Sequence, residues 1–294
     1  MPKAFSKLLI PAFLFLFCFA KNSKATHIVG GNLAYEYLGP SGGGNYGYRV
    51  TFKTYIDCNS IFWGAGFPEP VLQVGVYEGP ALPASSANLP RTTIINMPIL
   101  DSMPITAGVS STCAVGTSIC VYEITYQATV NLPLSFQGYH LFYDRCCRVG
   151  SIVNLNLPGS QGLAFHAYIP PTLVNNSSPV FSDVPVPFLC VNDTASILNT
   201  AFDPDGDVLI FSFEDPYQGF GTTLSPAPPL PNPLTWPIPP VNWQAGYNKN
   251  QPFGVAGYNY INASTGYSRY MSNAIGDYVV AVEIKEYRNN ILIG

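Results

Sequence analysis

The sequence predicts an all-β protein made of tandem β-sandwich domains. Three observations lead to this prediction. Strand-forming residues are abundant, with 19 Tyr and 18 Phe among 294 residues, and helical periodicity is nearly absent. Stretches that alternate apolar and polar residues recur instead, separated by turn-forming clusters drawn from 26 Gly, 28 Pro and nearby Asn and Ser. Many short strands with turn residues between them are typical of sandwich folds.

The expected strands share a two-residue alternation that would bury one face of each. They are NLAYEYLG (32–39), YGYRVTFKTYID (46–57), LQVGVYEG (72–79), CVYEITYQATVNL (120–132), YHLFYDRCC (139–147), LAFHAYIP (163–170), VLIFSFED (208–215) and GDYVVAVEIKEY (276–287).

A domain boundary is expected near residues 168–190, where two prolines and an Asn-Asn-Ser-Ser run interrupt the strand pattern. The predicted organisation is a leader over 1–25, a first domain over 26–174 and a second over 175–294. Within the second domain, residues 222–240 carry eight prolines. We interpret this segment as a long loop, because the aromatic-lined modules that bind Pro-rich ligands are mostly intracellular.

Residues 1–25 predict a secretory signal peptide. Two lysines precede the apolar run LLIPAFLFLFCFA, and Ser-Lys-Ala at 23–25 matches a small-x-small cleavage pattern. A lipoprotein signal with Cys18 as the acylated residue is disfavoured, because Phe17 is bulky where such signals want a small residue. No later segment has the run of about 18 apolar residues that a spanning helix needs. The protein is therefore expected outside the cell or on its surface, without a membrane span.

The charge balance argues against nucleic acid as a partner. The chain carries 13 Lys+Arg and 17 Asp+Glu, for a net charge of −4. The leader contains four lysines and no acidic residue, so its removal would leave −8. No basic run remains to contact phosphates or an anionic membrane surface.

Six cysteines remain after the leader, an even number that predicts disulfides in an exported protein. Cys113 and Cys120 enclose a short loop that could close locally. Adjacent strand residues point to opposite faces, so Cys146 and Cys147 are expected to reach different partners. The remaining candidates are Cys58 and Cys190. Zinc is disfavoured because no CxxC pair or neighbouring His supports it.

The segment AFDPDGDVLIF contains the candidate metal ligands Asp203, Asp205 and Asp207. Calcium takes six to eight oxygen ligands, and a tight turn through Pro204 and Gly206 could make the three carboxylates converge. The spacing is not that of an EF-hand. The alternative is a turn whose aspartates cap backbone amides, and the spacing alone does not separate the two interpretations.

No catalytic motif emerges, so the protein is not expected to be an enzyme. The strings IVGG and GPSGG match fragments of chymotrypsin-like proteases but lie too close together, with no His between them. His140 and His166 lie in apolar strand patterns where locally satisfied rings are the usual outcome, and His27 lies at the expected mature terminus. A glycosidase pair of Asp203 with Glu283 or Glu286 has no cleft to support it.

Several strings together resemble the amino-terminal region of gliding-motility-associated C-terminal-domain surface proteins of Bacteroidetes. They are THIVGGNLAYEY, TYIDCN, YDRCCR, NSSPVF with VPVPFLCVND, AFDPDGDVLIFSF, INASTGY and GDYVVAVEIKEYRNNILIG. Residues 178–294 also resemble a cadherin-like or PKD-like module of immunoglobulin type. The resemblance implies tandem Ig-like domains, calcium on Asp203, Asp205 and Asp207 near a domain junction, and further β modules of the same polypeptide downstream. Glu283 and Glu286 depart from the module's usual closing segment, which leaves a ligand from that strand open.

The expected function is that of a calcium-stiffened structural or adhesion module at the cell surface, with a surface protein or glycan as partner. The alternative is a carbohydrate-binding or accessory module of a secreted polysaccharide-degrading protein. It is suggested by Trp63, Trp236 and Trp243, which lie in Gly- or Pro-rich loops where a sugar could stack. Packing of these rings beneath the loops is the simpler interpretation.

Overall fold

The computed structural model describes residues 28–58, 67–105, 120–182, 188–221 and 230–294. The predicted signal peptide, His27, Trp63 and Cys113 lie outside these ranges. The described chain is all-β, with one short 3₁₀ turn, η1 (Pro158–Ser160), and no α-helix. Within the same ranges, no helix is long and apolar enough to cross a membrane.

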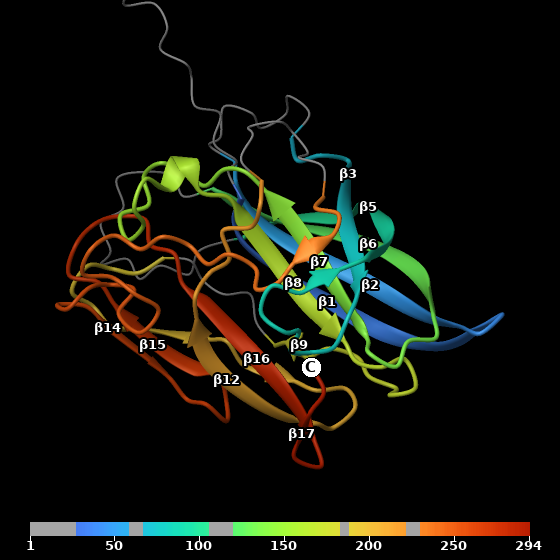
Figure 1. Ribbon diagram of the computed structural model, residues 1–294. Helices are drawn as coiled ribbons and strands as arrows, with labels where there is room; N and C mark the ends of the chain where they lie inside the picture. The colour runs from blue at the N-terminus through green and yellow to red at the C-terminus, as the bar shows by residue number, and fades with distance from the viewer. Residues whose placement is uncertain (1–27, 59–66, 106–119, 183–187, 222–229) are drawn as a thin grey trace, which may run out of the picture.

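Seven antiparallel strands form the largest sheet, in the order β1-β2-β6-β5-β3-β7-β8 (Figure 1). The strands are β1 (Ile28–Gly42), β2 (Asn45–Asp57), β3 (Val71–Glu78), β5 (Arg91–Ile105), β6 (Val121–Pro133), β7 (Tyr139–Arg145) and β8 (Leu163–Ile169).

Strand β2 shows how the alternation in the sequence becomes a core. Its buried side chains are Tyr48, Val50, Phe52, Thr54 and Ile56, at every second position, while the residues between them are only partly buried. A two-residue Gly43–Gly44 loop joins β1 to β2, and both glycines have positive φ, as tight hairpins require.

The seven-stranded sheet is curled, so that strands far apart in its order face each other across the buried side. The ring of Phe52 on β2 lies 4.8 Å from the ring of Tyr143 on β7 and 5.1 Å from that of Phe165 on β8. These strands are far apart in the sheet order, so such contacts require the sheet to curl. One face of a single curled sheet therefore encloses the main hydrophobic core.

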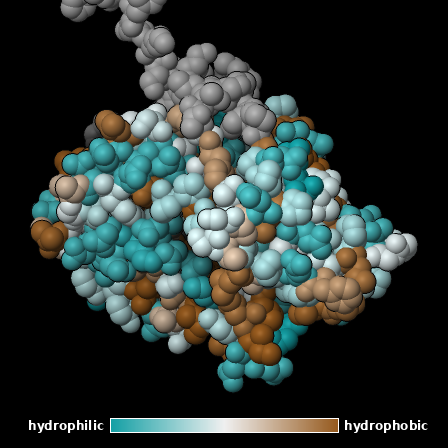
Figure 2. Space-filling view, viewed as in Figure 1, coloured by the Kyte–Doolittle hydropathy of each residue, from teal (hydrophilic) through white to brown (hydrophobic). Residues whose placement is uncertain are grey.

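The rest of the chain forms smaller antiparallel sheets beside the large one (Figure 1). Two have three strands each, and two are short pairs. They are β10 (Ala195–Leu198), β15 (Tyr267–Met271) and β14 (Tyr258–Ile261); β12 (Val208–Glu214), β16 (Ala281–Arg288) and β17 (Ile291–Leu292); β9 (Val180–Phe181) with β11 (Ala201–Phe202); and β4 (Asn88–Leu89) with β13 (Leu234–Thr235). Figure 2 shows apolar side chains gathered over β17, where Ile291 is 66% exposed.

The described part of the Pro-rich segment packs against the outer face of the large sheet. Leu234 and Ile238 are buried with Phe142 of β7 and with Leu89, in a second hydrophobic cluster. The β4–β13 pair adds a backbone connection at the same place. Residues 230–240, interpreted from the sequence as a loop, thus cover strands that precede them by about a hundred positions.

Two disulfide pairings differ from those that the sequence predicted. Cys120 bonds to Cys58, with 5.4 Å between their Cα atoms, so the predicted local bridge from Cys113 to Cys120 is wrong. The reason is strand register: Asp57 on β2 faces Val121 on β6, which makes Cys58 and Cys120 the next pair along the same ladder.

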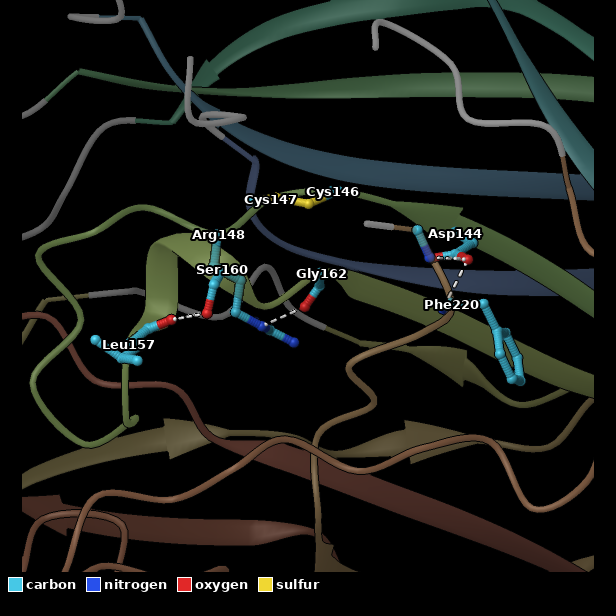
Figure 3. Close-up of a disulfide and its surroundings, with 9 residues drawn as sticks. Asp144, Cys146, Cys147, Arg148, Leu157, Ser160, Gly162 and Phe220 are labelled. Atoms are coloured by element: carbon cyan, nitrogen blue, oxygen red, sulfur yellow. Dashed lines mark hydrogen bonds between the residues drawn. A yellow bond between two sulfur atoms is a disulfide. The ribbon is translucent and has the colours of Figure 1, made fainter. Parts of the chain in front are cut away.

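Cys146 and Cys147 bond to each other, with Cα atoms 3.0 Å apart (Figure 3). The prediction that they reach different partners is wrong, because β7 ends at Arg145 and the alternation of strand side chains no longer applies beyond it. Cys190 is also disulfide-bonded. Five of the six predicted disulfide cysteines therefore lie in bridges, and the sixth, Cys113, is outside the described residues.

The segment YDRCCR that contains this disulfide anchors the chain before the Pro-rich segment. The Asp144 carboxylate accepts hydrogen bonds from the backbone N–H groups of Phe220 and Gly221, both at 2.9 Å (Figure 3). The Arg148 guanidinium donates to the carbonyl oxygens of Gly162 and Tyr217, at 2.8 and 3.0 Å. Burial raises the pKa of Asp144 to about 6 and lowers that of Arg148 to about 10.

We predict that Leu234→Ala will lower the free energy of unfolding by about 2–5 kcal/mol, since the side chain is fully buried in the second cluster. Urea unfolding followed by tryptophan fluorescence measures the change. The control is Thr235→Ala, an exposed neighbour on the same strand, expected to change stability by about 0.5 kcal/mol or less. Equal effects of the two substitutions would show that the Pro-rich segment contributes nothing to the core.

Candidate metal centre

The acidic turn between β11 and β12 is organised by one carboxylate oxygen. Oδ1 of Asp203 accepts hydrogen bonds from the backbone N–H groups of Asp205 and Asp207, both at 2.9 Å. Gly206 has a φ of 82°, which allows the chain to reverse within this short segment. The amide-capping interpretation of the turn is therefore confirmed for this one oxygen, and it leaves the other oxygen of Asp203 for a different role.

Three carboxylates converge on the inner side of the turn. Ligand atoms of Asp203, Asp207 and Glu286 all lie within 4.8 Å of one another. Glu286 comes from β16 and points inward because it faces Leu209 across the β12–β16 ladder. It is only 2% exposed, and Oδ2 of Asp203 is buried with no hydrogen-bond partner. The cluster therefore contains a buried oxygen that no N–H or hydroxyl group of the described chain reaches, so only a proton on a neighbouring carboxyl or a cation could satisfy it.

The third predicted ligand, Asp205, turns away from this cluster. Its Oδ2 accepts a hydrogen bond of 2.6 Å from the backbone N–H of Ser177. Two of the three aspartates in the sequence pattern are thus brought together, and Glu286 takes the third place. The neighbouring candidate Glu283 forms an ion pair of 2.9 Å with Lys285 instead. Glu283 and Glu286 are three positions apart on β16, so strand alternation places their side chains on opposite faces. This alternation was the sequence signal that could have told which glutamate joins the cluster.

Arg288 holds the cluster against the segment that precedes β9. Its guanidinium contacts both carboxylate oxygens of Asp207, at 2.7 and 2.5 Å. It also donates to the carbonyl oxygen of Asn175 and to Oδ1 of Asn176, at 3.0 and 2.9 Å. The Asp207 side chain is only 3% exposed, so its paired charge is largely removed from water.

The same segment is bonded along the free edge of β1. The Ser178 hydroxyl accepts a hydrogen bond from the Tyr35 N–H, and the Ser178 backbone N–H donates to the Tyr35 carbonyl oxygen, each at 2.9 Å. The Ser177 hydroxyl accepts from the Tyr37 N–H at 3.1 Å, and Asn176 is 1% exposed. In the Asn-Asn-Ser-Ser run, expected from sequence to be a linker, residues 176–178 are buried between the large sheet and the acidic turn, where they also cover an edge strand.

The electrostatic balance of the cluster is incomplete. The three carboxylates face one guanidinium, which leaves two negative charges uncompensated if all three are ionised. Burial, and then the hydrogen bond and negative charge of Asp203, raise the pKa of Glu286 to about 9. A buried carboxyl pair of this kind needs either a shared proton or a cation between its oxygens.

The donor set fits a hard divalent cation. All of the converging side-chain atoms are oxygens, and the orphaned Oδ2 of Asp203 is an acceptor that a cation would satisfy. Asp203, Asp207 and Glu286 would hold the ion. Asn176 lies beside them, where its Nδ2 donates to Glu286 at 3.3 Å and its Oδ1 accepts from Arg288 at 2.9 Å. Calcium prefers carboxylate and amide oxygens in a flexible arrangement, and it would supply charge neutralisation and crosslinking rather than chemistry.

The histidines of the sequence analysis lie in a different part of the fold. His140 is fully buried. Its Nδ1 lies 2.8 Å from Nε2 of His166, and its Nε2 lies 2.9 Å from the carbonyl oxygen of Pro80. The expectation of locally satisfied rings is confirmed for this pair. Burial lowers the pKa to about 4 for His140 and about 3 for His166, so both are neutral near pH 7.

The two described tryptophans are partly buried. Trp236 packs on both histidine rings, with centroids 5.3 and 5.6 Å away. The ring N–H of Trp243 donates to Asp215 at 2.8 Å. The packing of these rings beneath the loops agrees with the simpler of the two interpretations from sequence.

The raised pKa of Glu286 predicts a pH-dependent stability in the presence of a chelator. The folded state keeps this proton up to about pH 9, whereas the unfolded chain loses it near the ordinary value of 4.5. Between these values folding takes up a proton, so stability is greatest at the acidic end and falls as the pH rises, by at most about 1.4 kcal/mol per unit.

Urea unfolding at pH 5 to 9 in EDTA measures this slope, and Glu286→Gln should flatten it because the amide stays neutral throughout. Glu283→Gln, on the same strand with its Lys285 partner, is the control and should keep the slope. A slope that survives in Glu286→Gln would assign the proton to another group.

We predict that Arg288→Gln will destabilise the fold by about 1–3 kcal/mol, because it leaves the buried Asp207 carboxylate without its charge partner. The matched control is Arg49→Gln, which breaks an exposed ion pair with Glu36 and should cost about 1 kcal/mol or less. Thermal unfolding of the two variants compares them directly. An Arg288 variant as stable as the Arg49 variant would contradict the role assigned to Arg288 as the charge partner of Asp207.

Comparison with known proteins supplies no relative for this site. No family model matches the chain, and no curated protein or solved structure matches it either. The resemblance to gliding-associated surface proteins therefore stays an expectation from sequence, and the function proposed below rests on the geometry of the cluster.

Proposed function

We propose that this protein is a non-enzymatic structural or adhesion module of the cell surface, whose calcium site stiffens the contact between its two β regions. The first region is the seven-stranded sheet, and the second region is formed by the smaller sheets within residues 175–294. One observation carries the proposal. Three buried or partly buried carboxylates, facing the single positive charge of Arg288, lie where the second region meets the segment bonded to β1. A divalent cation has the charge that this cluster needs.

The mechanical consequence follows from what the ligands are attached to. Asp203 and Asp207 belong to the turn before β12, and Glu286 belongs to β16, while Asn176 precedes β9 and reaches the Tyr35 hydroxyl on β1. A cation bound by the three carboxylates would crosslink the acidic turn and the closing strand, and the Asn176 amide, which donates to both Glu286 and the Tyr35 hydroxyl, connects that crosslink to the edge of the large sheet. Such a crosslink suits a module that transmits force or holds an orientation.

The remaining parts of the proposal rest on sequence. The leader over residues 1–25 supports export, and the cysteines in bridges suit an oxidising compartment. The second region supports an Ig-type, cadherin-like assignment through its two three-stranded antiparallel sheets, β10-β15-β14 and β12-β16-β17, whose contact includes the Tyr270 and Phe213 rings.

We predict that 10 mM Ca²⁺ will raise the melting temperature of residues 26–294 by about 2–8 °C over the EDTA-treated protein. This range corresponds to about 1–3 kcal/mol for a Kd of roughly 0.1–1 mM, which is typical of extracellular calcium modules. Magnesium at the same concentration should have a smaller effect, because it demands a stricter octahedral geometry. Differential scanning calorimetry measures both.

The variants separate the cluster from the turn. Asp203→Asn and Glu286→Gln should lose the calcium response, whereas Glu283→Gln should keep it. Asp205→Ala should lower the melting temperature in EDTA by removing the bond to Ser177, and should still respond to calcium. An unchanged melting temperature in calcium, with the wild-type protein folded, would overturn the metal site.

A further inference from the structure

The outward face of the β10-β15-β14 sheet carries an unusual set of exposed side chains. In a sheet with one solvated face, the outer positions are commonly small or charged polar residues. Here three are tyrosines, exposed by 42%, 42% and 36%, and they share the face with one arginine. The members of this tyrosine face are Ser196, Leu198, Tyr258, Tyr260, Tyr267 and Arg269.

Strand register places these side chains in one continuous track. Tyr260 lies directly opposite Arg269, and Arg269 lies opposite Ser196 on the far strand. Tyr258 precedes Tyr260 by two residues on the same strand, about 7 Å away. Tyr267 is the diagonal neighbour of Tyr260, at a similar separation of about 7–8 Å. Three rings thus follow one another across the sheet at nearly regular spacing.

The opposite face of the sheet explains why these rings stay outside. Ser268 and Tyr270 alternate with the exposed positions of β15 and are 0% and 3% exposed. The Tyr270 ring packs against Phe213 and Phe253, with centroids 6.0 and 5.8 Å away. This packing covers the inner face of the sheet, which leaves the tyrosines on its outer face. Strands β14 and β15 lie on the side of the molecule away from β1 and β2 (Figure 1).

The charge of the tyrosine face is positive and uncompensated. Arg269 is the one charged side chain among its six members, and it forms no ion pair with any described carboxylate. The rest of the face offers hydroxyl groups, including the Tyr267 and Ser196 hydroxyls, which hydrogen-bond to each other at 2.7 Å. A ligand for this face therefore has an anionic group, hydroxyls to exchange hydrogen bonds, and apolar surface to cover the rings.

We propose that the tyrosine face binds an extended polysaccharide chain that carries carboxylate groups. A pyranose ring has an apolar C–H face that stacks on a tyrosine ring and a rim of hydroxyls that bond to the polar groups around it. The Arg269 guanidinium matches a uronic acid carboxylate through two parallel N–H donors. The row of rings along β14 and across to β15 suits an elongated chain rather than a single sugar.

Other occupants fit the face less well. A single-stranded nucleic acid also stacks on aromatic rings, but its backbone is held by a groove of cations that follows the phosphates, and this face has none. A carboxylated sugar chain is instead bound mainly through the uncharged faces of its rings, with one carboxylate paired to Arg269. A protein partner would use the same tyrosines and arginine, and the experiment below separates that outcome. The proposal names the ligand of the surface role proposed above, and it rests on that role only for its biological setting, since the tyrosine face and the carboxylate cluster share no residue.

The test is binding of the folded protein to polygalacturonate and to the same polymer after chemical reduction of its carboxyl groups. Affinity electrophoresis and isothermal titration calorimetry measure it, in both EDTA and calcium so that loss of the metal site and loss of glycan binding are distinguished. Wild-type protein is expected to bind polygalacturonate more tightly than the reduced polymer. Tyr260→Ala and Tyr267→Ala should each weaken binding to both polymers about tenfold.

Arg269→Gln should weaken binding to polygalacturonate about tenfold and leave the reduced polymer unaffected. Two controls match these changes: Phe136→Ala removes an aromatic side chain that is 74% exposed in the loop between β6 and β7, and Arg49→Gln removes one surface charge. Both should bind as wild type, and all variants should be folded at the assay temperature, as thermal unfolding will check. Three results would each overturn the proposal. They are no binding of the wild-type protein to both polymers, tyrosine variants that bind as tightly as the wild-type protein, and wild-type binding to oligothymidylate that is tighter than to polygalacturonate.

Discussion

Burial of carboxylates beside the Arg288 guanidinium is the constraint on which the arrangement of the two β regions depends. One planar donor group reaches Asp207, the carbonyl oxygen of Asn175 and the amide of Asn176, so it ties the closing strand to the turn and to the chain before β9. Because Asp207 is almost fully buried, its charge has no water to replace this partner. The position of the second region against β1 thus follows from charge pairing as well as from apolar packing.

Apolar packing makes the second attachment. The curled seven-stranded sheet encloses its main core on one face, and its other face at β7 would be exposed without a cover. Leu234 and Ile238 supply that cover, while Asp144 and Arg148 hold the preceding residues by their backbone groups. A Pro-rich segment suits this task, because proline presents apolar surface without a backbone N–H that burial would leave unsatisfied.

The two proposed binding features use opposite physical devices. The carboxylate cluster is buried, rigidly bonded and short of positive charge, which suits a small cation. The tyrosine face is exposed, flat and has an unpaired arginine, which suits a larger ligand with its own anionic groups. They lie on different sheets of the same region, so a stiffened junction and a ligand-presenting surface are compatible in one module.

The sequence by itself determined the all-β class and most of the strand positions, because a two-residue alternation depends only on local side-chain order. It also located the acidic turn, since Pro204 and Gly206 act within five residues, and it placed both histidines in satisfied strand positions. Tertiary structure decided everything that joins distant segments: Glu286 enters the cluster in place of Asp205, Cys58 meets Cys120 through the β2–β6 register, and residues 176–178 are buried against β1. The physical reason is the same in each case. Local spacing limits which face a side chain takes, but strand register and burial choose its partner, and both are set by the packing of the whole chain.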